Sequence, residues 1–528
     1  MLRLRKGRGE SVQMRRSMPA QGLLRLGAGA LAVLLAAGCA GAARAESLAD
    51  AITLAYQTNP TLQGQRAEQR ATDETYVQAR AGYRPTANVQ ATGTWYWQKF
   101  ASCQILFGCY SPTAGGLSQN YNELNAQLSV TQPIYTGGRA TAKVRAAEAQ
   151  VLAGREQLRQ TEGQVMMSVI QAYEDVRRDE QALAIRKDNV GVLQRQVDET
   201  RARFEVGEVT RTDVAQSEAQ LAAAQALLSS AQAQLSSSRA AYANVVGQSP
   251  ATLEPEPAFK VFPGTVDEAF DTVEINNPAI RYADYSEEAA EAQVAEAKAE
   301  RMPQVGLQGS YGYEQPISPF NTSANVRSTT AAVVFSQPLF AGGAVASQIR
   351  QYTEEANVAR IQLEQARRTS IQNVSQGWST LLAARANIIA DEEQVRAALV
   401  AFQGTRAEQQ AGLRTTLEVL SAQQVLEDAQ LSLVNARHDE YVASATVLNV
   451  MGLLEAKNLV PGIDRQLGSH TFEQLKHAPG YVPGVDEAVS SIDSIGSSHI
   501  SRLPPAVDAP ISTGSPDAAP PGATPAAH

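Results

Sequence analysis

Residues able to perform catalysis or hold a metal ion are few in this chain. Four of the five histidines lie beyond residue 469, and the fifth is His438. Cysteine and histidine do not occur at metal-site spacings, and the sequence has no nucleophile elbow. A Gly-x-Gly at 27–29 falls within the N-terminal leader. The sequence therefore predicts no enzyme activity, no metal and no cofactor.

The N-terminal 45 residues have the pattern of a secretory signal peptide. Seven Lys/Arg precede Leu26, an apolar run extends to Ala37, and Ala43-Arg44-Ala45 offers a small-x-small cleavage site. Residues 1–45 hold eight of the 45 basic and one of the 54 acidic residues, so the mature chain carries 37 against 53, net −16. A chain this acidic is a poor nucleic-acid binder, and we expect no nucleic-acid partner.

The signal peptide predicts export, and exported proteins can form disulfides, so the three cysteines are interpreted accordingly. Cys103 and Cys109 are an even pair six positions apart, which predicts a disulfide that closes a small loop. Cys39 follows Leu-Ala-Ala-Gly, which loosely resembles a lipoprotein cleavage site. Lipidation at Cys39 therefore stays open as an alternative to cleavage after Ala45.

The chain contains two copies of one unit. Residues 47–62 match 265–280, and a constant offset of 205 then pairs Pro133 with Pro338, Gly138 with Gly343, Gly207 with Gly412 and Gly247 with Gly452. We expect a first repeat over 46–256 and a second over 257–460. The tail over 461–528 is rich in Pro, Ser and Ala and is predicted to be disordered.

Each repeat is predicted to hold a short helix, two strands and two long helices. An Asn-Pro pair, at 59–60 and again at 277–278, marks a helix start. No proline occurs between Pro133 and Pro250, and apolar residues recur there every seven positions, as at Val151, Leu158 and Val165. This narrow seam predicts coiled-coil packing of helices roughly 100 and 50 Å long.

Four segments alternate between small apolar and uncharged polar residues. The apolar positions of the first segment are Ala87, Val89, Ala91, Trp95 and Trp97. Alternation alone also fits the edge of a soluble β-sandwich. The export signal, the aromatics near one end and the absence of a thick core favour the wall of a transmembrane β-barrel with a wet interior. Four strands cannot close a barrel, and lipid does not tolerate an open sheet edge, so several chains must pool their strands.

Proline and glycine mark the expected borders between helix and strand. Proline ends regular elements and a glycine pair permits a bend. The predicted junction residues are Pro85, Pro133, Pro303, Pro338, Gly137, Gly138, Gly342 and Gly343.

Over residues 46–460 the sequence resembles the TolC family of outer-membrane export ducts. The resemblance is carried by SLADAITLAYQTNP, by the junctions QPIYTGG and QPLFAGG, and by VGEVTRTDV with its partner AGLRTTLEV. It implies a homotrimer whose 12-stranded outer-membrane β-barrel continues into a periplasmic α-helical coiled-coil barrel. The implied partners are a periplasmic adaptor (membrane fusion) protein, an inner-membrane ABC or other exporter, and outer-membrane lipid.

The resemblance also implies a gate at the tips of the long helices. It assigns constraining contacts to Asp213 and Arg414, and an acidic ring at the entrance to Glu418, near the turn glycines Gly207 and Gly412. Gln409 replaces an aromatic residue usual in the family, and Ser421 replaces a second acid. Asp213 and Glu418 also fit a purely structural interpretation, as acids at the start of a helix.

Three functions are compared on this basis. The pattern favours a duct for type I protein secretion in the outer membrane of a Gram-negative bacterium. The same tube would serve multidrug efflux, which stays an alternative. A periplasmic coiled-coil adaptor or scaffold would explain the heptads but not the four alternating segments.

Overall fold

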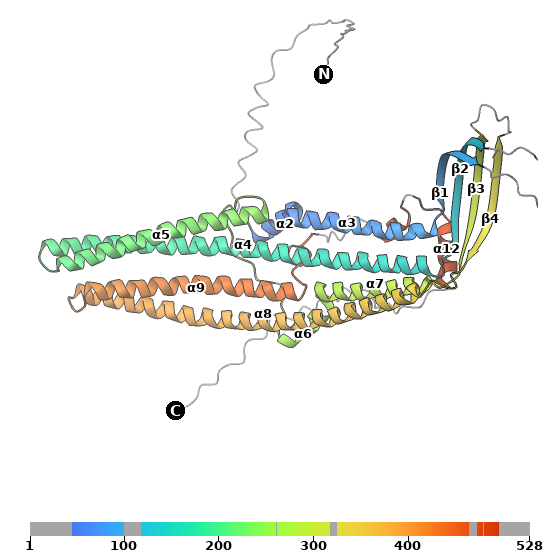
Figure 1. Cartoon of the computed structure of the whole chain (residues 1–528). Helices are drawn as coiled ribbons and strands as arrows, with labels where there is room; N and C mark the ends of the chain where they lie inside the picture. The colour runs from blue at the N-terminus through green and yellow to red at the C-terminus, as the bar shows by residue number, and fades with distance from the viewer. Residues whose placement is uncertain are drawn as a thin grey trace, which may run out of the picture. The chain divides into compact units, whose positions relative to one another are not determined.

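The computed structural model describes residues 45–99, 118–259, 261–316, 325–463, 472–478 and 480–495. The first repeat contains, in chain order, α2 (Leu48–Thr58), α3 (Pro60–Arg80), η1 (Ala81–Tyr83), β1 (Thr86–Lys99), β2 (Ser118–Tyr135), α4 (Arg139–Glu205) and α5 (Arg211–Val246). The second contains α6 (Val266–Asn276), α7 (Pro278–Ala299), β3 (Gln304–Pro316), β4 (Val326–Ser336), α8 (Ala344–Gln410) and α9 (Thr416–Val450). This order confirms the internal duplication (Figure 1).

The Asn-Pro pairs begin the same helix in both repeats. The Asn59 side chain accepts hydrogen bonds from the N–H groups of Thr61 and Leu62, and Asn277 does the same at the start of α7. Each asparagine amide also donates to a carbonyl near the end of the last long helix of its repeat, Val245 and Val450 respectively. The cap therefore fixes both the helix start and its place beside the long helices.

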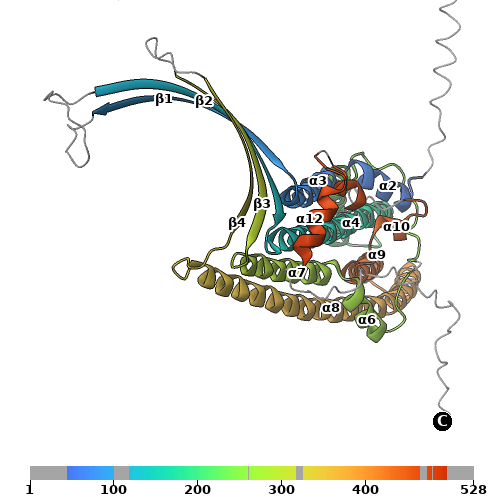
Figure 2. The same ribbon diagram turned by 90° about the vertical axis from the view of Figure 1, so that its right-hand side faces the viewer.

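The four strands form one antiparallel sheet in the order β1-β2-β3-β4 (Figure 2). The register sets Val89 opposite Leu128, Leu128 opposite Tyr311, and Tyr311 opposite Thr329. Since side chains alternate along a strand, this register places the apolar positions of all four strands on one face. The alternating segments are therefore strands, as predicted, and β1 and β4 are the two edges of the sheet in a single chain.

The long helices pack side by side in pairs, α4 with α5 and α8 with α9 (Figure 1). Both α4 and α8 have 67 residues, or about 100 Å at 1.5 Å per residue. Positions of the predicted seam are buried: Val151, Leu158 and Val374 are at most 1% exposed, and Val151 packs against Tyr76 of α3 rather than against α5. Among the described residues, the structure contains no helix sufficiently long and apolar to traverse a bilayer.

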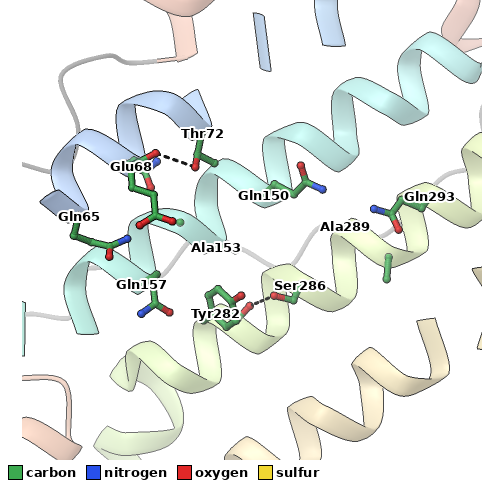
Figure 3. Close-up of a pocket in the computed structure, with 13 residues that line it drawn as sticks. Gln65, Glu68, Thr72, Gln150, Ala153, Gln157, Tyr282, Ser286, Ala289 and Gln293 are labelled. Atoms are coloured by element: carbon green, nitrogen blue, oxygen red, sulfur yellow. Dashed lines mark hydrogen bonds between the residues drawn. The ribbon is translucent and has the colours of Figure 1, made fainter. Parts of the chain in front are cut away.

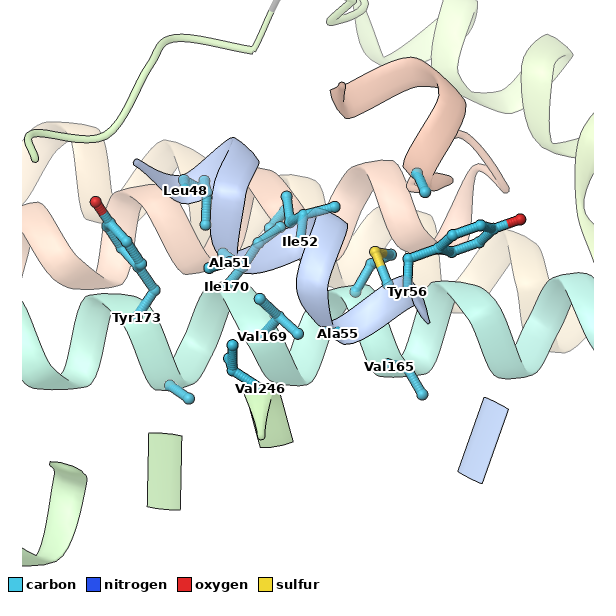
Figure 4. Packing of buried hydrophobic residues seen from close by; sticks show 14 of the residues in the cluster. Leu48, Ala51, Ile52, Ala55, Tyr56, Val165, Val169, Ile170, Tyr173 and Val246 are labelled. Carbon is cyan, nitrogen blue, oxygen red and sulfur yellow. The ribbon is translucent and has the colours of Figure 1, made fainter. Parts of the chain in front are cut away.

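A hydrophobic cluster joins α2 to α4, α5 and α9 (Figure 4). Leu48 and Ile52 from α2 pack with Val169 and Ile170 from α4. The first residue of the unit, Glu46, is built into the edge of this cluster. Its carbonyl accepts a hydrogen bond from the Tyr173 hydroxyl at 3.0 Å, and its carboxylate accepts one from the Tyr242 hydroxyl at 2.7 Å.

Seven of the eight predicted junction residues lie between a helix and a strand, and Pro133 is the exception. Pro85 and Pro303 lie directly before β1 and β3, and Pro338 lies two residues after β4. Pro133 lies inside β2, next to a register shift between Pro133 and Tyr135. Each glycine pair precedes a long helix in the left-handed region, with φ of +73° and +85° at Gly137 and Gly138, and +60° and +84° at Gly342 and Gly343.

The prediction of disorder from residue 461 onward is wrong for part of the tail. Three short helices follow α9, namely α10 (Ala456–Leu459), α11 (Phe472–Lys476) and α12 (Val485–Ser494). The last two are ordered because they bury side chains against the first repeat: Leu475 against Ala147 and Val151, and Val489 against Tyr83 and Ala140. Cys39, Cys103, Cys109 and the residues beyond 495 lie outside the part of the chain that the structure describes.

Candidate functional site: the helix tips and the contacts between repeats

The predicted gate residues lie in or next to two tip turns, which join α4 to α5 and α8 to α9 (Figure 1). Both turns contain a glycine in the left-handed region, Gly207 with φ +81° and Gly412 with φ +77°. A side chain is strained at this φ, so glycine is the natural residue there. The two turns therefore share one backbone design.

Asp213 belongs to the cap of α5. Its carboxylate accepts hydrogen bonds from the Thr210 N–H at 2.9 Å and the Thr210 hydroxyl at 2.7 Å, and the Thr210 hydroxyl in turn accepts from the Asp213 N–H. The side-chain bond from Thr210, followed by the backbone bond, holds the pKa of Asp213 below its usual value. The structural interpretation of Asp213 as a helix-start acid thus matches its contacts within the chain.

Glu418 has the equivalent place in α9 and an additional partner. It accepts from the Thr415 N–H at 2.8 Å, and the Arg414 guanidinium lies 2.7 Å from its other oxygen. The Thr415 backbone bond, then the bonds from Arg414 and the Thr415 hydroxyl, lower the pKa of Glu418 to about 2. The Arg414 guanidinium also binds Glu408 at 2.9 Å. Glu418 is therefore ionised at every physiological pH and partly neutralised by Arg414.

The structure thus brings Arg414 and Glu418 together and leaves Asp213 bonded within the other turn. Gln409, one turn before Gly412, is 3% exposed at the end of α8. Its side chain is therefore buried within a single chain. The proposed roles of these residues as a gate require contacts between copies of the chain.

A polar cluster that sequence reasoning missed joins the two repeats near the tips. It consists of Arg186 and Asn189 on α4 with Gln423 and Glu427 on α9, and we refer to it as the α4–α9 cluster. Glu427 accepts from Arg186 at 2.7 Å and from Asn189 at 2.5 Å, and Gln423 donates to Asn189 at 2.9 Å. Glu427 is 5% exposed. These polar residues adjoin the apolar seam in sequence, and their helical spacing alone does not show which neighbour they face.

A second contact between the repeats centres on Arg159 of α4. Its guanidinium donates to Glu455 and Glu156, both at 2.8 Å, and to the carbonyls of Asn276 and Gly452. The close approach requires glycine at 452, where a Cβ would lie 2.5 Å from the Asn276 carbonyl oxygen. Arg159 therefore fixes the end of α9 and the end of α6 against α4.

His438 forms a third contact between the repeats. Its Nε2 lies 3.0 Å from Asp175 of α4, and its Nδ1 lies 2.9 Å from Asp439. Burial lowers the pKa of His438, but the bonds to Asp175 and Asp439 outweigh burial and the nearby Arg178, so the pKa is raised overall. This histidine is placed as a structural ion-pair partner.

A pocket of about 380 Å³ lies between α3, α4 and α7 (Figure 3). Its lining is rich in glutamine, including Gln65, Gln150, Gln157 and Gln293, and its titratable side chains are Glu68 and Tyr282. Glutamine amides bind water and carry no charge, and they offer neither a nucleophile nor a strong base. The lining of this pocket is therefore suited to binding water rather than to catalysis.

The chain matches known outer-membrane proteins over most of its length. The model of the family described as "Outer membrane efflux protein" matches residues 51–248 and 270–453. The outer membrane efflux protein BepC of Brucella suis is 34% identical over 418 residues, covering 79% of this chain and 88% of the relative. The alkaline protease secretion protein AprF of Pseudomonas aeruginosa is 23% identical, covering 65% of this chain and 72% of the relative.

The fold is likewise similar to that of a solved structure. A crystal structure of a membrane protein from Pseudomonas aeruginosa superimposes with a TM-score of 0.68 at 20% identity, covering 80% of this chain and 92% of the other. At this identity the likeness concerns the fold, in which a small sheet continues into long paired helices in a duplicated arrangement. The family match confirms the resemblance to TolC-type ducts. It also confirms the prediction that the chain is not an enzyme, because the family consists of ducts. The chain belongs to the outer membrane efflux protein family, and it is an export duct of the Gram-negative outer membrane that extends into the periplasm.

Proposed function

We propose that three copies of this chain close a 12-stranded barrel in the outer membrane and a helical tunnel below it. One observation carries the proposal: the four-stranded sheet has two unpaired edges, β1 and β4, and one apolar face. Each unpaired backbone group in hydrocarbon costs several kcal/mol, so a sheet of this kind needs neighbouring strands at both edges. Further copies of the same chain supply them, and the family resemblance sets the number at three.

Two adjacent alanines in β4 test this proposal. Ala331 pairs with Gly309 and lies on the apolar face, whereas Ala332 pairs with Gln308 and lies on the polar face. Arginine on the lipid side near the bilayer midplane costs about 2–4 kcal/mol, and a water-filled interior tolerates it. We expect Ala331→Arg to lose the heat-sensitive oligomer on gels and the outer-membrane fraction, while Ala332→Arg keeps both. Equal behaviour of the two variants would contradict an outward apolar face.

The tips are the proposed docking place for a periplasmic adaptor, which connects the duct to an inner-membrane ABC or other exporter. Val206 and Leu413 in the tip turns are 72% and 76% exposed. Apolar side chains that project from a turn favour a protein contact. Leu413→Glu should abolish cross-linking to the adaptor and export, while the trimer stays intact. Unchanged export would remove the tip from the docking surface.

The cargo that we propose is protein, through type I secretion. The relative AprF, whose name states alkaline protease secretion, supports this proposal. Multidrug efflux is the second candidate, because BepC is more similar and is named an efflux protein. Deletion of the gene, with complementation, separates them: loss of secreted protein at unchanged drug sensitivity supports secretion, and the converse supports efflux.

At the entrance, three Glu418 carboxylates in one narrow mouth would attract cations. We expect Glu418→Ala to weaken the block by multivalent cations in single-channel recording. Arg414→Ala should strengthen this block, because it removes the cation that now lies 2.7 Å from Glu418. Unchanged block in both variants would exclude Glu418 from the entrance.

A further inference from the structure

The C-terminal segment buries two carboxylates at the first helix–strand junction. In α12 the buried residues are Asp486, Val489 and Asp493, which share one face of the helix, and both aspartates are 0% exposed. Aspartate is almost never fully buried unless it is paired, because an ionised carboxylate loses its water. α12 must therefore have specific polar partners at this junction.

Asp493 caps α4 from more than 350 residues away. One carboxylate oxygen accepts from the N–H groups of Thr136 and Gly138 at 2.7 and 3.1 Å and from the Thr136 hydroxyl at 2.8 Å. The other accepts from the Thr141 N–H at 3.1 Å and the Thr141 hydroxyl at 3.0 Å. The N-cap residue of α4 is Gly138, which has no side chain to satisfy these donors. Asp493 supplies both the missing cap and a negative charge at the positive end of the helix.

Asp486 secures the other side of the same junction. Its carboxylate lies 3.0 Å from Arg84 Nε and 3.8 Å from Arg80, both of which are largely buried. Arg84 also donates to the carbonyl of Lys476 at 3.4 Å, so it links α11 to α12. Phe472 of α11 packs edge-on against Tyr76 with ring centroids 5.1 Å apart.

The second repeat lacks the residues that bind α11 and α12 in the first repeat. At the offset of 205, Thr136 and Thr141 correspond to Ala341 and Ala346, and at the offset of 218, Arg84 corresponds to Met302. The neighbouring Leu339 and Phe340 are 91% and 90% exposed, whereas their counterparts Ile134 and Tyr135 are partly buried. The two junctions share one origin. They nevertheless differ in the residues available for hydrogen bonds and in how far their apolar side chains are buried.

We propose that residues 472–478 and 480–495 form a strap that locks the bend between β2 and α4. Within the described part of a single chain, the bend between β4 and α8 has no equivalent strap, so we expect the first junction to be the more rigidly held of the two.

Amide hydrogen exchange on the full mature chain in detergent tests this proposal. In the unmodified protein we expect the Thr136, Gly138 and Thr141 amides to exchange about tenfold or more slowly than those of Ala341, Gly343 and Ala346. Asp493→Asn places an amide N–H₂ among groups that all donate, and should abolish this difference without changing the second junction. Glu487→Gln is the matched control: it removes a charge from the exposed face of α12 but keeps an oxygen that can accept from the Gly484 N–H, and it should leave both junctions unchanged.

Thr141→Ala provides a milder variant in case Asp493→Asn accumulates poorly. It gives the first repeat the residue of the second and removes the bond that the Thr141 hydroxyl donates to Asp493 and the bond that it accepts from Tyr83, so exchange at Thr136 and Gly138 should accelerate severalfold. The strap would be overturned if the two junctions exchanged equally in the unmodified protein. It would also be overturned if both variants matched Glu487→Gln.

Discussion

The two longest helices, α4 and α8, have equal length and equivalent places in the two repeats, yet their surroundings differ. α4 contacts α2, α3, α5, α7, α9 and α12, and it buries side chains along most of its length. α8 contacts chiefly α9, α7 and α6, and it leaves Val358, Ile361 and Ile389 at least 52% exposed. Duplication supplied two similar helices, of which one became the centre of the chain and the other lies at its edge with apolar side chains exposed.

The largest expected difference between the two helices is at Arg159. Arg159→Ala leaves Glu455 buried without its main partner, and breaking such a pair costs about 3–5 kcal/mol. Because Lys457 remains 3.6 Å from Glu455, we expect the lower end of this range in denaturant unfolding. Arg368→Ala in α8 removes an exposed pair with Glu364 and should cost at most about 1 kcal/mol. Equal losses would mean that α4 is no more central than α8.

The α4–α9 cluster should affect opening more than folding. Glu427→Ala leaves Asn189 and Arg186 without their acceptor, at a cost of about 1–3 kcal/mol, and frees α9 from α4 near the tip. We expect larger and more frequent openings in single-channel recording. The control is Glu392→Ala, which removes only the exposed pair of α8 with Arg437. Similar conductance in both variants would exclude the cluster from control of the tunnel mouth.

His438 gives a smaller effect that depends on pH. Its pKa in the folded chain is raised, so the stabilisation is complete below the unfolded value of about 6.5 and is lost as pH rises through the folded value. The melting temperature of the unmodified protein should therefore fall between pH 6 and pH 8 relative to that of His438→Gln. A pH dependence identical in both proteins would show that Asp175 and Asp439 do not hold a proton on the ring.

The smallest expected effects lie at the tips, where both repeats begin a helix with a threonine cap and an acid three residues later. Thr210→Ala and Thr415→Ala each remove one capping hydroxyl and should each cost about 1 kcal/mol. Local hydrogen exchange at the starts of α5 and α9 measures the two losses separately. A loss at Thr415 well below the loss at Thr210 would show that Arg414, which also bonds to Glu418, holds the cap of α9 without the hydroxyl.

The elements of this fold were predictable because they repeat. Heptad spacing, Asn-Pro helix starts and alternating strands each depend on residues near one another in sequence. The contacts that give the repeats different roles were not predictable in this way. Arg159, Glu427 and Asp493 meet partners far along the chain, and the same residue types occur on exposed faces elsewhere.

The tail illustrates this limit most directly. Its richness in proline, serine and alanine predicts disorder, and the two aspartates of α12 resemble solvated charges in sequence. Their burial depends on Thr136, Thr141 and Arg84, which lie in a junction more than 340 residues earlier. Composition predicts whether a segment is ordered when it is alone. The ordered part of this tail depends on the residues of the first junction, which bind it from a distant part of the chain.

The place of Asp493 in the sequence has a consequence for biogenesis. A chain exported from its N-terminus delivers both repeats to the periplasm before this residue emerges from the translocon. The five bonds at the start of α4 consequently cannot form until almost every other segment is available. A prematurely terminated polypeptide would leave the donors of that helix end unsatisfied, and quality-control proteases could distinguish it from a finished product.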